Sequence, residues 1–125
     1  MRDSDRILGI IQAKSWRAEN GQTPVKEHLL MTRYCPKRVS DGEMLSIKDV
    51  QDILEIPLLG VIPEAKEVLL ASNAGTPIIL YPDCDAATAY SDAVSRILGQ
   101  EMPVRFTSAV KKGFINKLLG WATCL

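Results

Sequence analysis

The sequence predicts part of a larger α/β domain in which helices flank a parallel sheet. Helices and short apolar strands alternate along the 125 residues. Strands that are apolar throughout are typical of parallel sheets covered on both faces. The pattern supplies two firm strands and one weak strand, which is too little sheet for four helices, and a helix precedes the first strand. A small α+β domain with an irregular sheet is the alternative interpretation.

The first helix is expected to begin almost at the N-terminus. Apolar residues recur at helical spacing from Ile7 to Ile11, and Asp3 or Ser4 can cap the helix. The sequence ENGQTP, residues 19–24, is rich in turn-forming residues and is expected to end the helix.

A strand and a second helix are expected next. The apolar run HLLMTRY, residues 28–34, predicts a buried strand that ends before Pro36. Ser46 and Asp49 have the spacing of a capping box, which predicts that a helix begins there and continues to residue 54.

The second half of the chain repeats the alternation. PLLGVIP, residues 57–63, predicts a second buried strand, and residues 64–75 predict a helix that Gly75 closes in a left-handed turn. Residues 76–80 are expected to be a short extended segment. The apolar spacing then predicts a helix over residues 85–98.

The C-terminal segment is basic and amphipathic, although the whole chain has no net charge. The last 24 residues carry a charge of +4 and the first 101 carry −4, which indicates an anionic partner for this segment. At about 100° per residue, the apolar side chains fall within an arc of roughly 160°. A ten-residue helix is about 15 Å long, so it can lie in a membrane interface but cannot cross the bilayer. The predicted membrane-binding residues are Lys112, Phe114, Ile115, Lys117, Leu118, Leu119 and Trp121.

The organisation predicted from these patterns has three parts. Residues 1–100 form a partial domain, residues 101–109 a linker, and residues 110–121 the amphipathic helix. Packing of that helix on the domain itself, or on a partner protein, is the alternative to membrane binding.

Several kinds of site are not predicted. GIIQAKS, residues 9–15, lacks the second glycine of a phosphate loop and lies inside a predicted helix. The chain has one histidine, no C-x-x-C motif and no arrangement that resembles a catalytic triad, so no catalytic residue, zinc site or other metal site is assigned. The zero net charge gives no reason to expect nucleic-acid binding.

Binding is instead expected at the carboxyl ends of the two strands, where parallel sheets hold their ligands. Thr32 and Arg33 follow the first strand, and Pro63 and Glu64 follow the second. Position alone leaves open whether these are binding residues or solvated loop residues.

Three stretches carry a resemblance to a known family. RDSDRILGI (residues 2–10), GVIPE (60–64) and KKGF (111–114) are similar to segments of the MinD family of septum-site-determining ATPases, within the MinD/ParA-type deviant Walker P-loop ATPases. The likeness extends over residues 2–120 and covers only the C-terminal half of that family's chain. The half with the deviant phosphate loop has no counterpart here.

The resemblance implies the C-terminal half of a P-loop ATPase sheet together with a membrane-targeting helix. The family is implied to bind ATP with Mg²⁺, to form a homodimer around ATP, to bind anionic lipid on the cytoplasmic face of the inner membrane, and to act with MinC-like and MinE-like proteins. No cofactor and no ATP hydrolysis are expected of this chain alone. By resemblance, the base-binding residues are Thr32, Arg33, Ile62, Pro63 and Glu64, and the partner-binding residues are Asp3, Asp5 and Ile10.

The main functional hypothesis is therefore a MinD-like fragment that binds the membrane and Min-system partners and helps to block septum formation away from mid-cell. Two alternatives remain. In the first, the chain is a small interaction protein whose amphipathic tail docks on a partner protein. In the second, it is one piece of a split ATPase.

Overall fold

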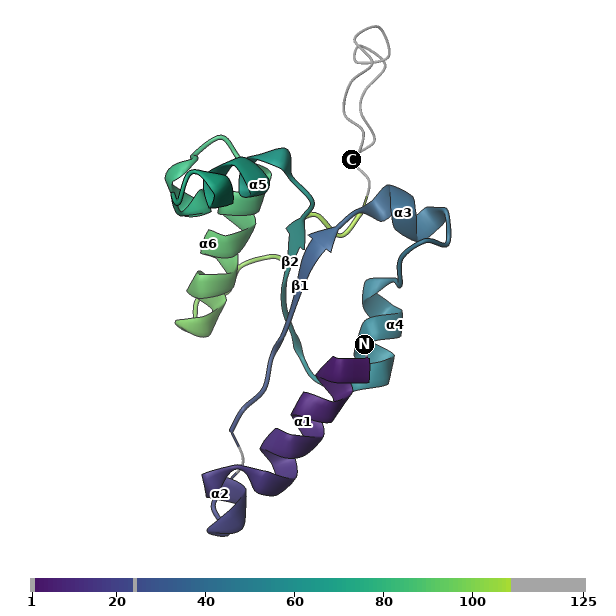
Figure 1. The fold of residues 1–125 in the computed structure, drawn as a ribbon, viewed down its shortest axis with the longest axis vertical. Helices are drawn as coiled ribbons and strands as arrows, with labels where there is room; N and C mark the ends of the chain where they lie inside the picture. The colour runs from purple at the N-terminus through teal and green to yellow at the C-terminus, as the bar shows by residue number, and fades with distance from the viewer. Residues whose placement is uncertain (1, 24, 109–125) are drawn as a thin grey trace, which may run out of the picture.

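Two parallel strands lie at the centre of the molecule, with helices on both sides (Figure 1). The computed structural model describes residues 2–23 and 25–108. In chain order the elements are α1 (Arg2–Lys14), α2 (Trp16–Glu19), β1 (Leu29–Tyr34), α3 (Pro36–Ser40), α4 (Ile47–Leu54), β2 (Leu58–Pro63), α5 (Lys66–Asn73), the 3₁₀ helix η1 (Ile78–Leu80) and α6 (Asp85–Ile97). In Figure 1, α5 and α6 lie on one side of the strands, and α3 and α4 lie on the other. The predicted α/β class with a parallel sheet flanked by helices is confirmed.

Three local predictions were wrong. Residues 78–80 form the 3₁₀ helix η1, not an extended segment, so the weak third strand does not form. The first helix already includes Arg2, so Asp3 lies in its first turn and is not its cap. The helix also ends at Lys14, and Ser15 caps the separate short helix α2, with its hydroxyl accepting a hydrogen bond from the Ala18 amide at 3.3 Å.

The core lies between β2 and the first half of α6. Ile62 is 2% exposed and packs with buried small residues of α6, chiefly Ala86 and Ala89. Small side chains let the helix approach the strand closely, and Gly60 continues this contact along β2. A Cβ atom at Gly60 would lie 3.4 Å from the Cβ of Ala93 and 3.1 Å from Nη1 of Arg96.

Arg96 connects this core to the segment that follows α6. Its guanidinium donates hydrogen bonds to the carbonyl oxygens of Leu59 (2.6 Å), Met102 (2.9 Å) and Pro103 (2.5 Å). The Tyr34 hydroxyl donates to the Thr107 carbonyl at 3.4 Å. The segment after α6 is therefore held against both strands.

Helix α4 begins with the predicted capping box. The Ser46 hydroxyl accepts a hydrogen bond from the Asp49 amide at 3.1 Å, and the Asp49 carboxylate accepts one from the Ser46 amide at 3.0 Å. The Ser46 hydroxyl also donates a hydrogen bond to the Asp49 carboxylate at 2.7 Å. This bond, followed by the one from the Ser46 amide, lowers the pKa of the Asp49 carboxyl group below its ordinary value. A carboxyl group whose pKa is lowered by folding stabilises the fold at neutral pH, and that contribution is lost as the pH falls through the lowered pKa.

Replacing Ser46 with alanine should therefore destabilise the chain by about 1 kcal/mol at neutral pH. Below the lowered pKa of Asp49 the difference from the parent should shrink, because the protonated carboxyl no longer supports the cap. Ser91→Ala is the matched control, since the Ser91 hydroxyl only bonds back to the Ala87 carbonyl within α6 (3.1 Å). Urea unfolding at several pH values measures both variants, and an equal loss for the two would contradict the role of the cap.

Candidate functional site

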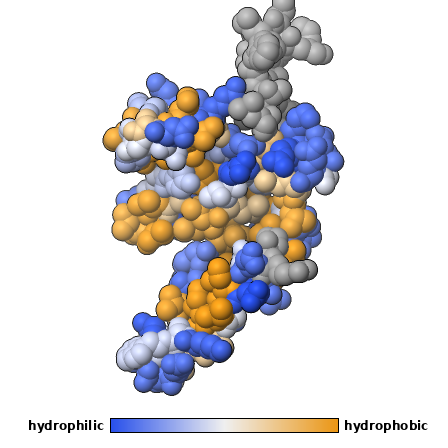
Figure 2. Space-filling model, in the orientation of Figure 1, coloured by the Kyte–Doolittle hydropathy of each residue, from blue (hydrophilic) through white to orange (hydrophobic). Residues whose placement is uncertain are grey.

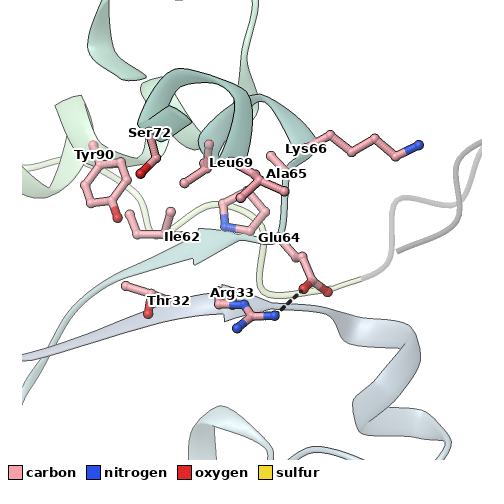
Figure 3. A pocket seen from close by; sticks show the side chains of 11 residues that line it. Thr32, Arg33, Ile62, Glu64, Ala65, Lys66, Leu69, Ser72 and Tyr90 are labelled. Carbon is pink, nitrogen blue, oxygen red and sulfur yellow. Dashed lines mark hydrogen bonds and ion pairs between the residues drawn. The ribbon is translucent and has the colours of Figure 1, made fainter. Parts of the chain in front are cut away.

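The carboxyl ends of β1 and β2 form one side of a hollow of about 480 Å³, with α5 and α6 forming the rest (Figure 3). This volume lies within the range of about 300–1,000 Å³ that is common for small-molecule sites. All five residues predicted to bind a nucleotide base line it: Thr32, Arg33, Ile62, Pro63 and Glu64. Their assembly at one place follows from the parallel pairing, which brings both carboxyl ends to the same edge of the sheet.

The backbone of β1 is distorted where it reaches the hollow. Arg33 has a φ of +56°, a left-handed conformation that non-glycine residues rarely adopt, and the pairing register shifts between Met31 and Tyr34. Such conformations cost energy and concentrate at functional sites. The Tyr34 carbonyl accepts a hydrogen bond from the Glu64 amide at 3.0 Å, which ties the two strand ends together beyond the distortion.

Arg33 and Glu64 contribute an ion pair to the site. Nη2 of Arg33 lies 3.3 Å from Oε1 of Glu64, and the two side chains are 80% and 14% exposed (Figure 3). The other carboxylate oxygen, Oε2 of Glu64, is buried and accepts no hydrogen bond from the described residues. A buried carboxylate oxygen without a donor is costly, and an N–H group of a ligand would satisfy it.

The rest of the lining comes from α5 and α6, and the sequence reading did not assign it to the site. Ala65, Val68, Leu69 and Ser72 are spaced as one helical face of α5 and its N-terminus, and Lys66 adds a charged side chain. The sequence could have predicted these α5 residues, because a helix that directly follows a parallel strand begins over that strand's carboxyl end. Tyr90 of α6, expected only on the helix's apolar face, is half-buried and also lines the hollow.

The predicted partner-binding residues lie elsewhere, all exposed on α1. Asp3 and Ile10 are two helical turns apart and share one face of the helix. Asp5 lies on another face, where α1 and the end of α4 line a second hollow with Glu55. The structure therefore brings together two of these three residues.

The remaining predicted residues lie outside the described part of the chain. They are the membrane-binding set of the C-terminal segment: Lys112, Phe114, Ile115, Lys117, Leu118, Leu119 and Trp121. Within the described residues, no helix is long and apolar enough to cross a membrane. Across residues 2–23 and 25–108, no three His, Cys, Asp or Glu side chains gather where they could hold a metal ion.

Comparison with known proteins relates the chain to one group. No family model matches it. The septum site-determining protein MinD of Escherichia coli (strain K12) is 60% identical over 120 residues, and MinD of Neisseria meningitidis serogroup B is 57% identical over the same length. Each match covers 96% of this chain and 44% of the relative, so the chain spans a little under half the length of these relatives.

Solved structures agree with the sequence comparison. The MinD cell division protein of Aquifex aeolicus matches with a TM-score of 0.70 and 30% identity, over 83% of this chain and 41% of that one. MinD in the MinC:MinD cell division protein complex of the same organism also gives a TM-score of 0.70, with 29% identity over 86% of this chain and 41% of the other. At these identities, nearly the whole length of the chain is similar to the C-terminal part of MinD.

Proposed function

We propose that this chain is a MinD-like protein of cell-division site selection that binds Min-system partners and the inner membrane. The observation that carries the proposal is the 60% identity to E. coli MinD over 96% of the chain. The similarity to MinD in a MinC:MinD complex supports a MinC-like protein as one partner. MinE-like proteins, a homodimer and a location on the cytoplasmic face of the membrane belong to the same proposal.

A MinC binding assay tests this proposal directly. Asp3 and Ile10 share an exposed face of α1, and an acidic and an apolar side chain together offer a basic, apolar partner a specific contact. Purified E. coli MinC should bind the chain, and Asp3→Lys should weaken the binding at least tenfold. Asp52→Lys is the matched control, because Asp52 is an equally charged, exposed residue on α4. No binding of MinC by the parent chain, or equal loss in both variants, would refute the proposal.

The hollow at the strand ends is proposed to hold the adenine base of ATP. Apolar residues of β2 and α5, among them Ile62 and Leu69, offer a surface for a flat ring. Oε2 of Glu64 accepts no hydrogen bond from the described residues, so it can accept one from the exocyclic amine of the base. The chain has no phosphate loop, so the phosphates and Mg²⁺ would be held by the N-terminal portion that its relatives have.

Replacing Glu64 with alanine should weaken ATP binding by about ten- to a hundredfold, since a hydrogen bond to a charged group is worth about 1.5–3 kcal/mol. The measurement uses a hybrid in which the N-terminal portion of E. coli MinD precedes this chain. Glu67→Ala serves as the control, because Glu67 is an exposed carboxylate on α5, three residues away, and does not line the hollow. If the two variants bind ATP equally well, the base does not contact Glu64.

The split-ATPase alternative is compatible with the same site, because the second piece would supply the phosphate loop. The other alternative, a tail that docks on a protein partner, differs in its dependence on lipid. An affinity for vesicles that does not change with their anionic lipid content would favour that alternative.

A further inference from the structure

We infer that the hollow at the strand ends has a second occupant, the basic and amphipathic C-terminal segment of this same chain, residues 111–119, with Phe114 as its anchor. Docking there holds the segment away from the membrane, which makes the hollow an autoinhibitory site. The inference rests on the proposed membrane binding and adds a means of regulating it. Because the same hollow is proposed to hold the adenine base, the base and the segment exclude one another.

The hollow has apolar walls that the described residues leave uncovered. Ile62, Pro63, Val68 and Leu69 all line it, and the Leu69 side chain is 64% exposed. Figure 2 shows apolar side chains at the surface over α5 and α6. A cavity of about 150 Å³ is enough for a benzene-sized ring. At about 480 Å³, the hollow therefore has room for one aromatic side chain and an apolar neighbour.

The residues that precede the C-terminal segment are fixed beside this hollow. Phe106 packs against the core cluster that contains Ile62, and Ile62 also lines the hollow. Nε of Arg105 lies 2.9 Å from Oδ2 of the buried Asp92 on α6. The Thr107 carbonyl accepts its hydrogen bond from a tyrosine at the carboxyl end of β1 (Figure 1). The described part of the chain ends one residue later, so the C-terminal segment starts close to the hollow.

The connection to Phe114 is long enough to reach the hollow and short enough to favour docking. Phe114 lies seven positions after Thr107, and seven extended residues span at most about 23 Å. A short flexible connection keeps its two ends at an effective concentration on the order of millimolar. A weak contact between Phe114 and the hollow is therefore enough to populate the docked state.

The charge of the C-terminal segment complements the hollow. The last 24 residues carry a charge of +4, and Oε2 of Glu64 is buried at the hollow without a donor among the described residues. In the predicted helix, Lys111 precedes Phe114 by three positions and shares its face. Arg33 already pairs with Oε1 of Glu64, and Lys66 points out of the hollow in Figure 3. The ammonium group of Lys111 can therefore donate the hydrogen bond that Oε2 lacks.

Leu69→Gln should raise the affinity of the chain for phosphatidylglycerol vesicles at least threefold. The substitution weakens docking without changing the C-terminal segment, and a threefold gain corresponds to a parent that is docked about two-thirds of the time. Leu70→Gln is the matched control, because Leu70 is the next residue of α5, is 62% exposed and does not line the hollow. Vesicle sedimentation measures the three affinities. No gain for Leu69→Gln, or equal gains for both variants, would overturn the inference.

Hydrogen exchange provides a second readout that needs no lipid. Without vesicles, the amides of residues 114–119 should exchange at least threefold faster in Leu69→Gln than in the parent or in Leu70→Gln. Equal exchange rates in all three proteins would overturn the inference. Protection that increases with protein concentration would mean that the segment docks on a second copy of the chain, which would also overturn it.

The proposed membrane binding and the docking inference fail separately. If no variant bound vesicles but Leu69→Gln still exchanged faster than Leu70→Gln, the membrane binding would be refuted and the docking supported. If the parent bound vesicles and Leu69→Gln changed neither the affinity nor the exchange rates, the docking inference alone would be refuted.

Discussion

Leu118→Glu should abolish binding of the chain to vesicles that contain anionic lipid. Leu118 lies near the middle of the apolar arc predicted for the C-terminal segment. Burying a leucine is worth roughly 1.5–3 kcal/mol, which corresponds to a ten- to hundredfold loss of affinity or more. A carboxylate in its place adds the cost of removing a charge from water. Vesicle sedimentation measures the loss.

Asn116→Glu is the matched control for this prediction. Asn116 lies within the polar arc, so the substitution adds the same carboxylate without removing an apolar side chain. It should weaken binding only modestly, through repulsion from the headgroups. If Leu118→Glu bound as well as the parent, the segment would not insert its apolar face into the membrane.

Lys117→Glu belongs to the same prediction but should respond to salt. Lys117 lies at the border of the arc, where its stem can contact apolar surface and its ammonium can reach the headgroups. Reversing the charge removes one attraction and adds one repulsion, each about 1 kcal/mol near an anionic surface. Both contributions shrink as salt shortens the Debye length, so the parent and the variant should converge at high ionic strength.

Arg96→Leu should destabilise the fold by about 2–4 kcal/mol. The three carbonyl oxygens that Arg96 binds belong to β2 and to residues 102 and 103, so its loss frees the segment after α6 from the sheet. The stability of Arg96→Lys should lie between that of the parent and that of Arg96→Leu, because an ammonium group cannot reach all three acceptors in the same fork geometry. Urea unfolding monitored by circular dichroism gives the values.

Arg17→Leu controls for the general effect of losing an arginine. The Arg17 guanidinium donates one exposed hydrogen bond, to the Thr23 carbonyl at 2.9 Å, and should cost about 0.5 kcal/mol or less. If Arg96→Leu and Arg17→Leu lowered the free energy of unfolding equally, the connection through Arg96 would not stabilise the fold.

The parts of the fold that the sequence predicted are those with strong local signals. The capping box at Ser46 fixed the start of α4, and Gly75, with a φ of +64°, closes α5 in the expected left-handed turn. The Thr76 amide bonds to the Ala71 carbonyl at 2.9 Å, which completes that turn.

The failed predictions depended on tertiary context. Residues 78–80 are apolar enough for a strand, but they pack against α5 and α6 and not beside β2, so they curl into the 3₁₀ helix η1. Apolar composition alone cannot distinguish a strand from another buried segment.

The candidate site was predicted in part because parallel strands bring their carboxyl ends together. That rule identified Thr32, Arg33 and Glu64 as neighbours although 31 residues separate the last two. It could not identify Tyr90, because the face of α6 that meets the hollow depends on how closely its alanines approach β2. The left-handed backbone of Arg33 was also unforeseen, since arginine carries no preference for it.

ATP hydrolysis in the presence of anionic vesicles and MinE tests whether this chain is a MinD-like module without its own phosphate site. We expect no turnover above background for the chain alone. Turnover should appear in the hybrid in which the N-terminal portion of E. coli MinD precedes this chain. Turnover by the isolated chain at the rate of the hybrid would contradict this claim.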